Sequence, residues 1–397
     1  MASDFLKNIA DTVKDKIGDT FESVKRQIVG KEVTVYPSYG YRDRADPETW
    51  IVPVRVWVHD NRDTPFVEEY IRNRAVRHFE QDLQRPLAED EKERLTACLE
   101  NFIADNKSNE EVEFKFADKT FRSEHRTSPN GVLEDTLRIP DAVVRPLLAE
   151  LHGGGHWLPL NATAGNGHGT GEGRIAFLEP AGLSVVSDID DTIKVTHVPA
   201  GKKTVLRNTF LREFKAAAGM RDRYAALTAE QFGQAGDVSF HYISGSPWQL
   251  YGLLSSFLIE EQKFPAGTFH MKNLRLNPFE SGALDTVKSF ALGGDLATLD
   301  QKIRQITSLM INLPERKFVL VGDSGEKDPE VYRAIKELFP GQVAGIYIRD
   351  VLADRLAGME RITGEDVPVT LDTSEIVAEM RELIARAAGD TREQPTL

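Results

Sequence analysis

Alternating apolar and polar positions dominate the first part of the chain. This period of two is typical of half-buried β-strands, and Pro and Gly cluster between the alternating runs. Strands are predicted over residues 32–43, 50–60, 112–128 and 131–140. Between them, residues 65–83 and 87–105 carry apolar positions three or four apart and predict two amphipathic helices. We therefore expect residues 31–178 to form a β-rich, sandwich-like domain with a helical insertion.

After residue 180 the pattern changes to short, almost fully apolar runs separated by amphipathic segments. The apolar runs cover residues 183–188, 238–244, 267–271, 317–323 and 342–348. Helices are predicted between them over residues 203–219, 247–262, 299–313 and 329–339. Apolar strands that alternate with helices indicate a parallel sheet covered on both faces. We expect a doubly wound α/β domain over residues 179–360, with its ligands at the carboxyl ends of the strands.

Three further segments are less regular. Residues 1–30 predict an amphipathic helix with five basic and five acidic side chains, so both packing on protein and contact with a membrane surface stay open. Residues 361–397 are predicted to form a helical tail. Residues 152–173 are rich in Gly and predict a flexible loop. Three glycines between His152 and His156 disfavour the helix that would make them a metal-binding pair.

Composition narrows the class of protein. The 397 residues are 41% hydrophobic and 28% charged, which is typical of a soluble globular protein with two or three domains. The net charge of −13 argues against a nucleic-acid partner. One cysteine, Cys98, and no apolar run long enough for a transmembrane segment indicate a cytoplasmic protein, with peripheral membrane contact left open.

Candidate chemistry follows three of the predicted strands. The polar side chains at these strand ends are Asp188, Asp190, Thr192, Ser244, Asp323 and Asp328. Because the carboxyl ends of parallel strands meet at one edge of a sheet, these groups are expected to converge. Converging carboxylates repel one another unless a cation lies among them, and Mg²⁺ is the usual cation for oxygen ligands beside phosphate.

Several of these residues also have a structural interpretation. Asp191 could act as a loop cap, and Ser246, which precedes a proline, is predicted to cap a helix. Asp328 also precedes a proline, so metal ligand and helix cap both stay open. Lys302 alone would be taken for a surface residue. Ser324 stands in GDSG, a string found around protease nucleophiles, but it follows a parallel strand and lacks a His/Asp partner set.

Four motifs together resemble the signature of the haloacid dehalogenase superfamily of phosphohydrolases. They are DIDDT, a serine at a strand end, a lysine on a helix, and GDSGEKD. More narrowly, SDIDDTIKVT, YISGSPWQLY and FVLVGDSGEKDPEVY resemble the phosphatidate phosphatase family typified by the fungal actin-patch-associated enzyme, and we identify the chain as a bacterial member. The close resemblance covers about residues 175–350; the β-rich region fits the family more loosely.

The resemblance implies a role for each motif residue. Asp188 attacks phosphorus to form an aspartyl-phosphate, and Asp190 protonates the leaving group and then activates water. Ser244 binds phosphoryl oxygens, Lys302 neutralises developing charge, and Thr192 shapes the turn. The implied Mg²⁺ ligands are Asp188, Asp190 through its backbone carbonyl, Asp323 and Asp328.

The expected activity is Mg²⁺-dependent hydrolysis of a phosphomonoester, with phosphatidate or a related lipid phosphate as substrate. The alternatives are a phosphatase for a soluble metabolite or phosphoprotein, and a scaffold with a vestigial hydrolase domain. Residues 194–215 carry six basic side chains against one acid, which fits either a solvated helix face or attraction of an anionic substrate. Residues 273–300 are expected to form one wall of the site near Trp248 and Tyr251.

Overall fold

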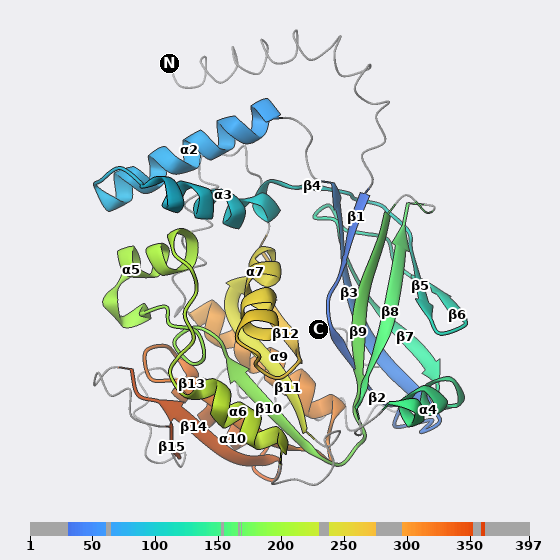
Figure 1. The fold of residues 1–397 in the computed structure, drawn as a ribbon. Helices are drawn as coiled ribbons and strands as arrows, with labels where there is room; N and C mark the ends of the chain where they lie inside the picture. The colour runs from blue at the N-terminus through green and yellow to red at the C-terminus, as the bar shows by residue number, and fades with distance from the viewer. Residues whose placement is uncertain are drawn as a thin grey trace.

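The structure is a computed structural model. It describes residues 31–60, 65–151, 155–165, 167, 169–229, 238–274, 296–351 and 359–361. The helix predicted in residues 1–30 and all but the first residue of the tail predicted from 361 lie outside the described residues. Within these ranges the strands form two sheets, called sheet A and sheet B, with helices around sheet B (Figure 1). The predicted α/β class is confirmed.

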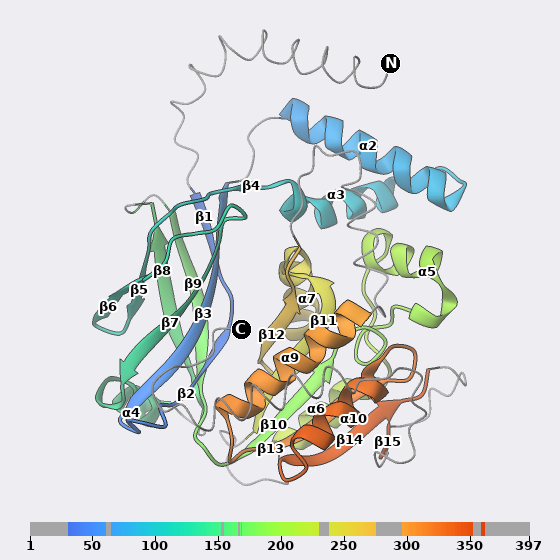
Figure 2. The same cartoon turned by 180° about the vertical axis from the view of Figure 1, so that it is seen from behind.

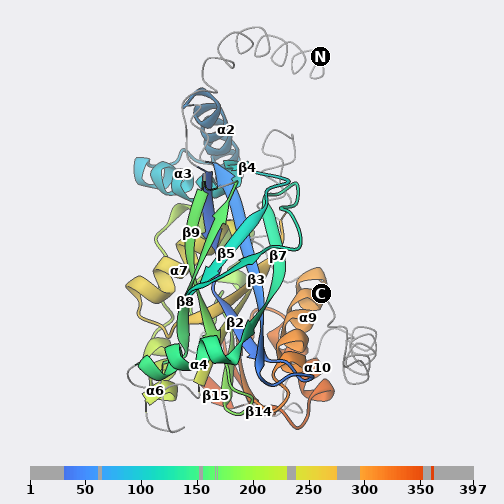
Figure 3. The ribbon, with the colours of Figure 1, turned by 90° about the vertical axis from the view of Figure 1, so that its right-hand side faces the viewer.

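Sheet A is mixed and contains nine strands of the described chain. They are β1 (Lys31–Val35), β2 (Ser38–Arg42), β3 (Thr49–Asp60), β4 (Asp105–Asn106), β5 (Val112–Phe116), β6 (Lys119–Arg122), β7 (Val132–Pro140), β8 (Trp157–Ala164) and β9 (Gly169–Phe177). A sandwich would have two separate sheets. Here the strands join into one, because β9 pairs in parallel with both β1 and β2 and antiparallel with β8 (Figure 3). The single sheet encloses an apolar core.

Much of the Gly-rich segment predicted to be a loop instead forms β8 and the first half of β9, so the prediction is wrong for these residues. Gly169, Gly171 and Gly173 lie where β1 approaches most closely. A Cβ on Gly171 would stand 1.9 Å from the carbonyl oxygen of Val33, and one on Gly173 would stand 2.5 Å from Val35 Cγ1. Glycine here permits close approach of two strands, a role that composition alone does not distinguish from flexibility.

The two helices predicted over residues 65–83 and 87–105 are present as α2 (Pro65–Leu83) and α3 (Glu89–Ile103), and α4 (Asp141–Glu150) follows β7. Acidic side chains in the first turn stabilise the start of α3, and Glu91 accepts a hydrogen bond from the Ala88 backbone at 3.1 Å. Although this insertion interrupts sheet A in the sequence, it packs on helical segments of the sheet B region, over residues 207–211 and 248–250. Phe79 and Leu95 share a buried cluster with Val185 of that sheet.

Sheet B consists of β10 (Leu183–Asp188), β11 (Val238–Pro247), β12 (Gly267–Lys272), β13 (Lys317–Asp323), β14 (Val343–Arg349) and β15 (Met359–Arg361). Their order is β12-β11-β10-β13-β14-β15; neighbouring strands are parallel except for β15. All six residues of the central strand β10 are buried. The chain moves to one side of β10 through β11 and β12 and to the other side from β13 onward. The crevice for ligands in such sheets lies where the direction changes, beside the end of β10.

Helices cover both faces of sheet B. They are η2 (Val198–Ala200), α5 (Lys202–Leu206), η3 (Arg207–Leu211), α6 (Met220–Ala229), η5 (Trp248–Leu250), α7 (Tyr251–Ser255), η6 (Ser256–Glu261), α9 (Leu296–Asn312) and α10 (Asp328–Leu338). Helices α9 and α10 cover one face and α6 and α7 cover the other, while α2 and α3 lie beyond α5 and α7 (Figure 2). The helix predicted over residues 203–219 ends at Leu211. The chain beyond it is extended, because Ala216 forms a β-bridge with Lys194.

The two sheets share buried contacts. Tyr39 and Ile51 of sheet A lie in one apolar cluster with Val186 of sheet B and Ile303 of α9. The fully buried Arg316 guanidinium donates to the backbone oxygens of residues 179, 181 and 183, and so fixes the segment that joins the sheets. Among the described residues, no helix is both long and apolar enough to cross a bilayer.

Candidate active site

Asp188 is the last residue of β10 and lies at the carboxyl edge of sheet B. It is 1% exposed, and Lys302 Nζ of α9 donates to its Oδ1 at 2.8 Å. The same ammonium donates to Asp328 Oδ1 at 2.7 Å and to Glu326 Oε2 at 3.2 Å. Burial alone would lower the pKa of Lys302, but the surrounding carboxylates raise it well above its usual range. Lys302 is therefore a buried cation, and an assignment to the surface would be wrong.

The loop between β13 and α10 supplies the other carboxylates. Asp323 Oδ1 accepts from the backbone of Gly325 at 2.6 Å and of Glu326 at 3.1 Å. Asp328 is the first residue of α10, and its Oδ2 accepts from the Asp323 backbone at 3.1 Å. This bond requires Asp328 to lie against Gly322, where a Cβ would meet Asp328 Oδ2 at 2.4 Å. Asp328 therefore holds the loop through the Asp323 backbone and holds the Lys302 ammonium. It is the first residue of α10 and not its cap, and its role as a metal ligand stays a prediction.

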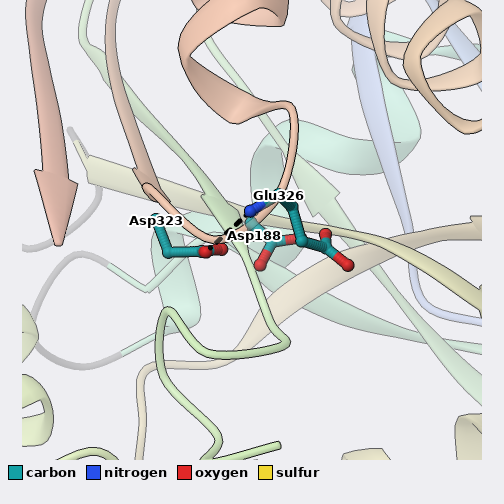
Figure 4. A group of neighbouring side chains, drawn as sticks. All are labelled: Asp188, Asp323 and Glu326. Carbon is teal, nitrogen blue, oxygen red and sulfur yellow. Dashed lines mark hydrogen bonds between the residues drawn. The ribbon is translucent and has the colours of Figure 1, made fainter. Parts of the chain in front are cut away.

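Three carboxylates are close enough to share one cation (Figure 4). Asp188, Asp323 and Glu326 each offer an oxygen within 4.8 Å of the other two. Burial raises the pKa of Asp188 and of Asp323 well above the usual range, in both cases with repulsion from neighbouring carboxylates. Burial also raises the pKa of Glu326 to about 7. Buried oxygen donors that repel one another suit a hard divalent cation, which would offset the repulsion.

Asp190 lies in a different electrostatic environment from Asp188. Lys194 Nζ donates to Asp190 Oδ1 at 2.6 Å, and Thr196 Oγ1 donates to the same oxygen at 2.7 Å. Ser244 and Ser246 donate to Oδ2 at 3.3 and 3.2 Å. Burial would raise the pKa of Asp190, but Lys194 and these hydrogen bonds bring it below its usual value. The two aspartates of the motif therefore lie in opposite electrostatic environments, Asp190 beside a cation and Asp188 among other carboxylates.

The remaining residues of DIDDT build the loop. Asp191 has a left-handed backbone with φ of 56°, and its carboxylate accepts from three consecutive backbone N–H groups, those of Thr196, His197 and Val198. This supports its interpretation as a loop cap. Thr192 Oγ1 donates to Asp188 Oδ2 at 3.1 Å and lies 3.4 Å from Asp323 Oδ2, so it links the first strand end to the fourth.

The structure brings all of the predicted site residues to one edge of sheet B and adds two that the sequence analysis did not select. They are Glu326, inside the GDSGEKD motif, and Lys194, at the start of the basic stretch. Asp190 lies four residues before Lys194, and this spacing is the sequence signal for the ion pair between them. Ser246 also contacts Asp190, so its role extends beyond a helix cap. Ser324 donates to Asp350 Oδ1 at 3.3 Å.

The basic stretch divides into buried and exposed side chains. Lys194 is 1% exposed and belongs to the site. Lys202, Lys203, Arg212 and Lys215 are exposed on and after α5. Of the predicted wall over residues 273–300, residues 275–295 lie outside the described residues. Asn273 and Leu274, at the end of β12, lie beside Trp248 and line the same cavity.

The sequence matches known proteins over sheet B and its helices. Residues 183–350 match the family model described as "Phosphatidate phosphatase APP1, catalytic domain". Phosphatidate phosphatase APP1 of Saccharomyces cerevisiae is 33% identical over 175 residues, which are 44% of this chain and 27% of that protein. Uncharacterized protein C29B5.04c of Schizosaccharomyces pombe is 30% identical over 182 residues, 45% of this chain and 27% of that protein. The chain thus spans about a quarter of the length of these relatives.

Proposed function

We propose that the protein is a Mg²⁺-dependent phosphomonoester hydrolase that works through an aspartyl-phosphate on Asp188. One observation carries the proposal: Asp188, at the end of the central strand, shares buried contacts with Lys302 and lies within 4.8 Å of Asp323 and Glu326. The order of strands in sheet B and the match over residues 183–350 support a doubly wound, haloacid dehalogenase-like fold for this region.

In the first step, a carboxylate oxygen of Asp188 attacks phosphorus while the bond from phosphorus to the alcohol oxygen breaks. Asp190 first separates from Lys194 and takes a proton from solvent, then gives that proton to the leaving alkoxide and is left ionised. Lys302 offsets the negative charge of the nucleophile, and Ser244 donates to a phosphoryl oxygen. Thr192 keeps Asp188 oriented through its 3.1 Å hydrogen bond.

In the second step, Asp190 removes a proton from water, and the water oxygen attacks phosphorus. The bond between Asp188 and phosphorus breaks, which restores the carboxylate and releases phosphate. The pair with Lys194 favours the ionised Asp190 that this step needs. Mg²⁺ held by Asp188, Asp323, Glu326 and the Asp190 carbonyl would stabilise the negative charge of the transferring phosphoryl group. Asp328 would act indirectly, by fixing Lys302 and Asp323.

A lipid phosphate, with phosphatidate as the first candidate, is the proposed substrate class. The name of the budding-yeast relative supports it, and exposed lysines at the start of α5 support an anionic substrate presented at a surface. The same features favour a cytoplasmic protein with peripheral membrane contact. A phosphorylated metabolite or phosphoprotein is the alternative outcome of the substrate comparison below.

Phosphate release from an aryl phosphate tests the chemistry. We expect activity with Mg²⁺, loss in EDTA, and at least a 10³-fold fall in kcat for Asp188→Asn, because the amide cannot attack phosphorus. Asp222→Asn is the matched control, since Asp222 is exposed on α6. Activity retained by Asp188→Asn would exclude the nucleophile. Phosphatidate in mixed micelles should then be hydrolysed with a higher kcat/KM than soluble monoesters.

A further inference from the structure

A cavity of about 710 Å³ lies between sheet A, α3 and the carboxyl ends of β11 and β12. Its lining comes from all three parts: Tyr36 and Trp57 of the β-rich region, Phe102 of α3, and Trp248 and Leu274 beside sheet B. Cavities of this size hold small organic ligands. The mechanism proposed above uses none of these residues.

The cavity adjoins the candidate active site along the chain. Ser246 donates to Asp190 at 3.2 Å, and Trp248 follows two residues later. Two residues span at most about 7 Å, so the rim of the cavity is close to the general acid. The Trp248 ring is fixed there by Tyr36, whose ring centroid is 4.5 Å away, and by the Arg55 guanidinium, 4.6 Å from the Trp248 centroid. A group attached to a phosphate at Asp188 could extend into the cavity.

Uncharged amides form a large part of the polar lining, beside Arg55, His125, Arg126, Ser128 and Glu134. These amides are Asn101, Asn106, Asn130, Gln249 and Asn273. In three of them one end of the amide is held by the protein: Asn106 Oδ1 accepts from Trp57 Nε1 at 2.8 Å, Asn273 Oδ1 accepts from Arg55 at 2.6 Å, and Asn101 Nδ2 donates to the Gln249 backbone at 3.1 Å. The opposite ends are fixed in orientation and suited to a ligand. Gln249 Oε1 is buried with no hydrogen-bond partner among the described residues.

Each basic side chain in the lining has an acidic neighbour, although the pair made by Arg126 is exposed to solvent. Arg55 pairs with Glu134, and Arg126 lies 3.3 Å from Glu111. A second phosphate would need a cation available to it, and acyl chains would leave the fixed amides unpaired at a cost of about 1–3 kcal/mol for each buried group. Amides beside aromatic rings fit a ligand that carries several hydroxyl groups on a carbon ring or chain, because each hydroxyl both donates and accepts.

We propose that this cavity binds the hydroxyl-bearing part of a sugar or polyol, and that this group is the alcohol portion of the phosphomonoester cleaved at Asp188. The substrate assignment rests on the proposed function, whereas binding of the polyol does not. Phosphatidate, the first candidate above, has no such group and would leave the cavity empty, so a preference for phosphatidate over the inositol esters would overturn this substrate assignment. A related phosphate ester borne on a sugar or inositol, free or attached to a lipid, would fill it.

Binding is tested first, by titrating the full chain with unphosphorylated methyl glucoside and myo-inositol. We expect saturable binding that weakens at least ten-fold in Asn130→Ala and in Gln249→Met, which keeps the size of the side chain. Trp157→Ala is the matched control, since Trp157 lies on β8 outside the cavity, and it should bind like the wild type. Absent binding, or binding that the two cavity variants leave unchanged, would overturn the proposal.

Hydrolysis is tested second, with inositol 1-phosphate, with a phosphatidylinositol in micelles whose ring carries a separate phosphomonoester, and with an aryl phosphate. The ratio of kcat/KM for the inositol esters to that for the aryl ester should fall at least ten-fold in both cavity variants; an unchanged ratio overturns the substrate assignment. A preference between the free and lipid-borne ester identifies the source. If the chain binds polyols but hydrolyses none of the three esters, the cavity assignment stands and the proposed function fails.

Discussion

Replacing Asp323 by Asn should stabilise the metal-free protein and abolish its activity. The carboxylate is fully buried, and its pKa is raised well above the usual range by burial and by its acidic neighbours. Its two backbone hydrogen bonds end on Oδ1, which an asparagine side chain retains. The substitution therefore removes a charge that the native state disfavours and leaves the packing and the loop contacts in place.

The size of the effect follows from the spacing of the charges. Two carboxylates 4.8 Å apart, the largest separation in the Asp188–Asp323–Glu326 group, repel by about 3.5 kcal/mol at an effective dielectric constant of about 20. Lys302 offsets part of this repulsion, so we expect a gain of about 1–3 kcal/mol in the free energy of unfolding. Because the folded-state pKa of Asp323 is raised, the native state loses stability as pH rises above the unfolded-state value of about 4. The advantage of the variant is thus largest at pH 8 and disappears near pH 4.

Urea unfolding in EDTA at pH 8 and pH 4.5 measures this difference directly. Asp190→Asn is the opposing control: it leaves buried Lys194 without its carboxylate, and should cost about 2–4 kcal/mol. Adding Mg²⁺ should stabilise the wild type and not Asp323→Asn. If Asp323→Asn is less stable than the wild type in EDTA at pH 8, repulsion within the carboxylate group does not govern this site.

Three further predictions concern other parts of the chain. Burial lowers the pKa of His270 to about 4. The free energy of unfolding should therefore fall by about 3 kcal/mol as pH falls from 6.5 to 4. Urea unfolding of His270→Gln over the same pH range should show a correspondingly smaller fall. Gly171→Ala should destabilise sheet A by more than 3 kcal/mol in the same assay, because its Cβ would overlap β1, whereas Gly341→Ala, where a Cβ meets nothing within 4 Å, should be neutral. Reversing Lys202 and Lys203 to Glu should lower kcat/KM for an anionic substrate about ten-fold at low salt and have little effect at 0.5 M salt. An effect that does not depend on salt would assign these lysines to a solvated helix face.

Much of sheet B could be predicted because its strands carry an unambiguous signal. A strand buried on both faces is almost wholly apolar, and the polar residues at its end stand out, as Asp188 does after LSVV. The register of parallel strands then brings Asp188 and Asp323 to one edge of the sheet. The sequence could not place α3 against η3 and η5, because an amphipathic face shows that a helix packs and does not show on what.

The Gly-rich segment of sheet A forms strands and not the predicted loop, and the reason is physical. Flexible loops and close strand contacts both favour residues without a Cβ, and they differ only in what lies opposite the glycine. Opposite Gly171 is a backbone oxygen of β1, more than 130 residues earlier in the chain. A short stretch of sequence around Gly171 does not contain the residue that lies opposite it. The alternation of buried and exposed positions over Trp157–Ala164 does indicate a strand, but the glycines around it suggest a loop.

Lys194 shows how a local charge count can conceal a site residue. Counted with its basic neighbours, it contributed to a surface field; in the fold it is buried, bonded to Asp190, and lies 5.0 Å from the centroid of the Phe214 ring. That position follows from the β-bridge between Lys194 and Ala216, which ends the predicted helix early and turns Phe214 toward the site. The same irregular segment therefore explains both the shortened helix and the ionised state of Asp190. A lysine that holds Asp190 ionised in the resting state favours the water-activating step, and leaving-group protonation then depends on how readily this one pair separates.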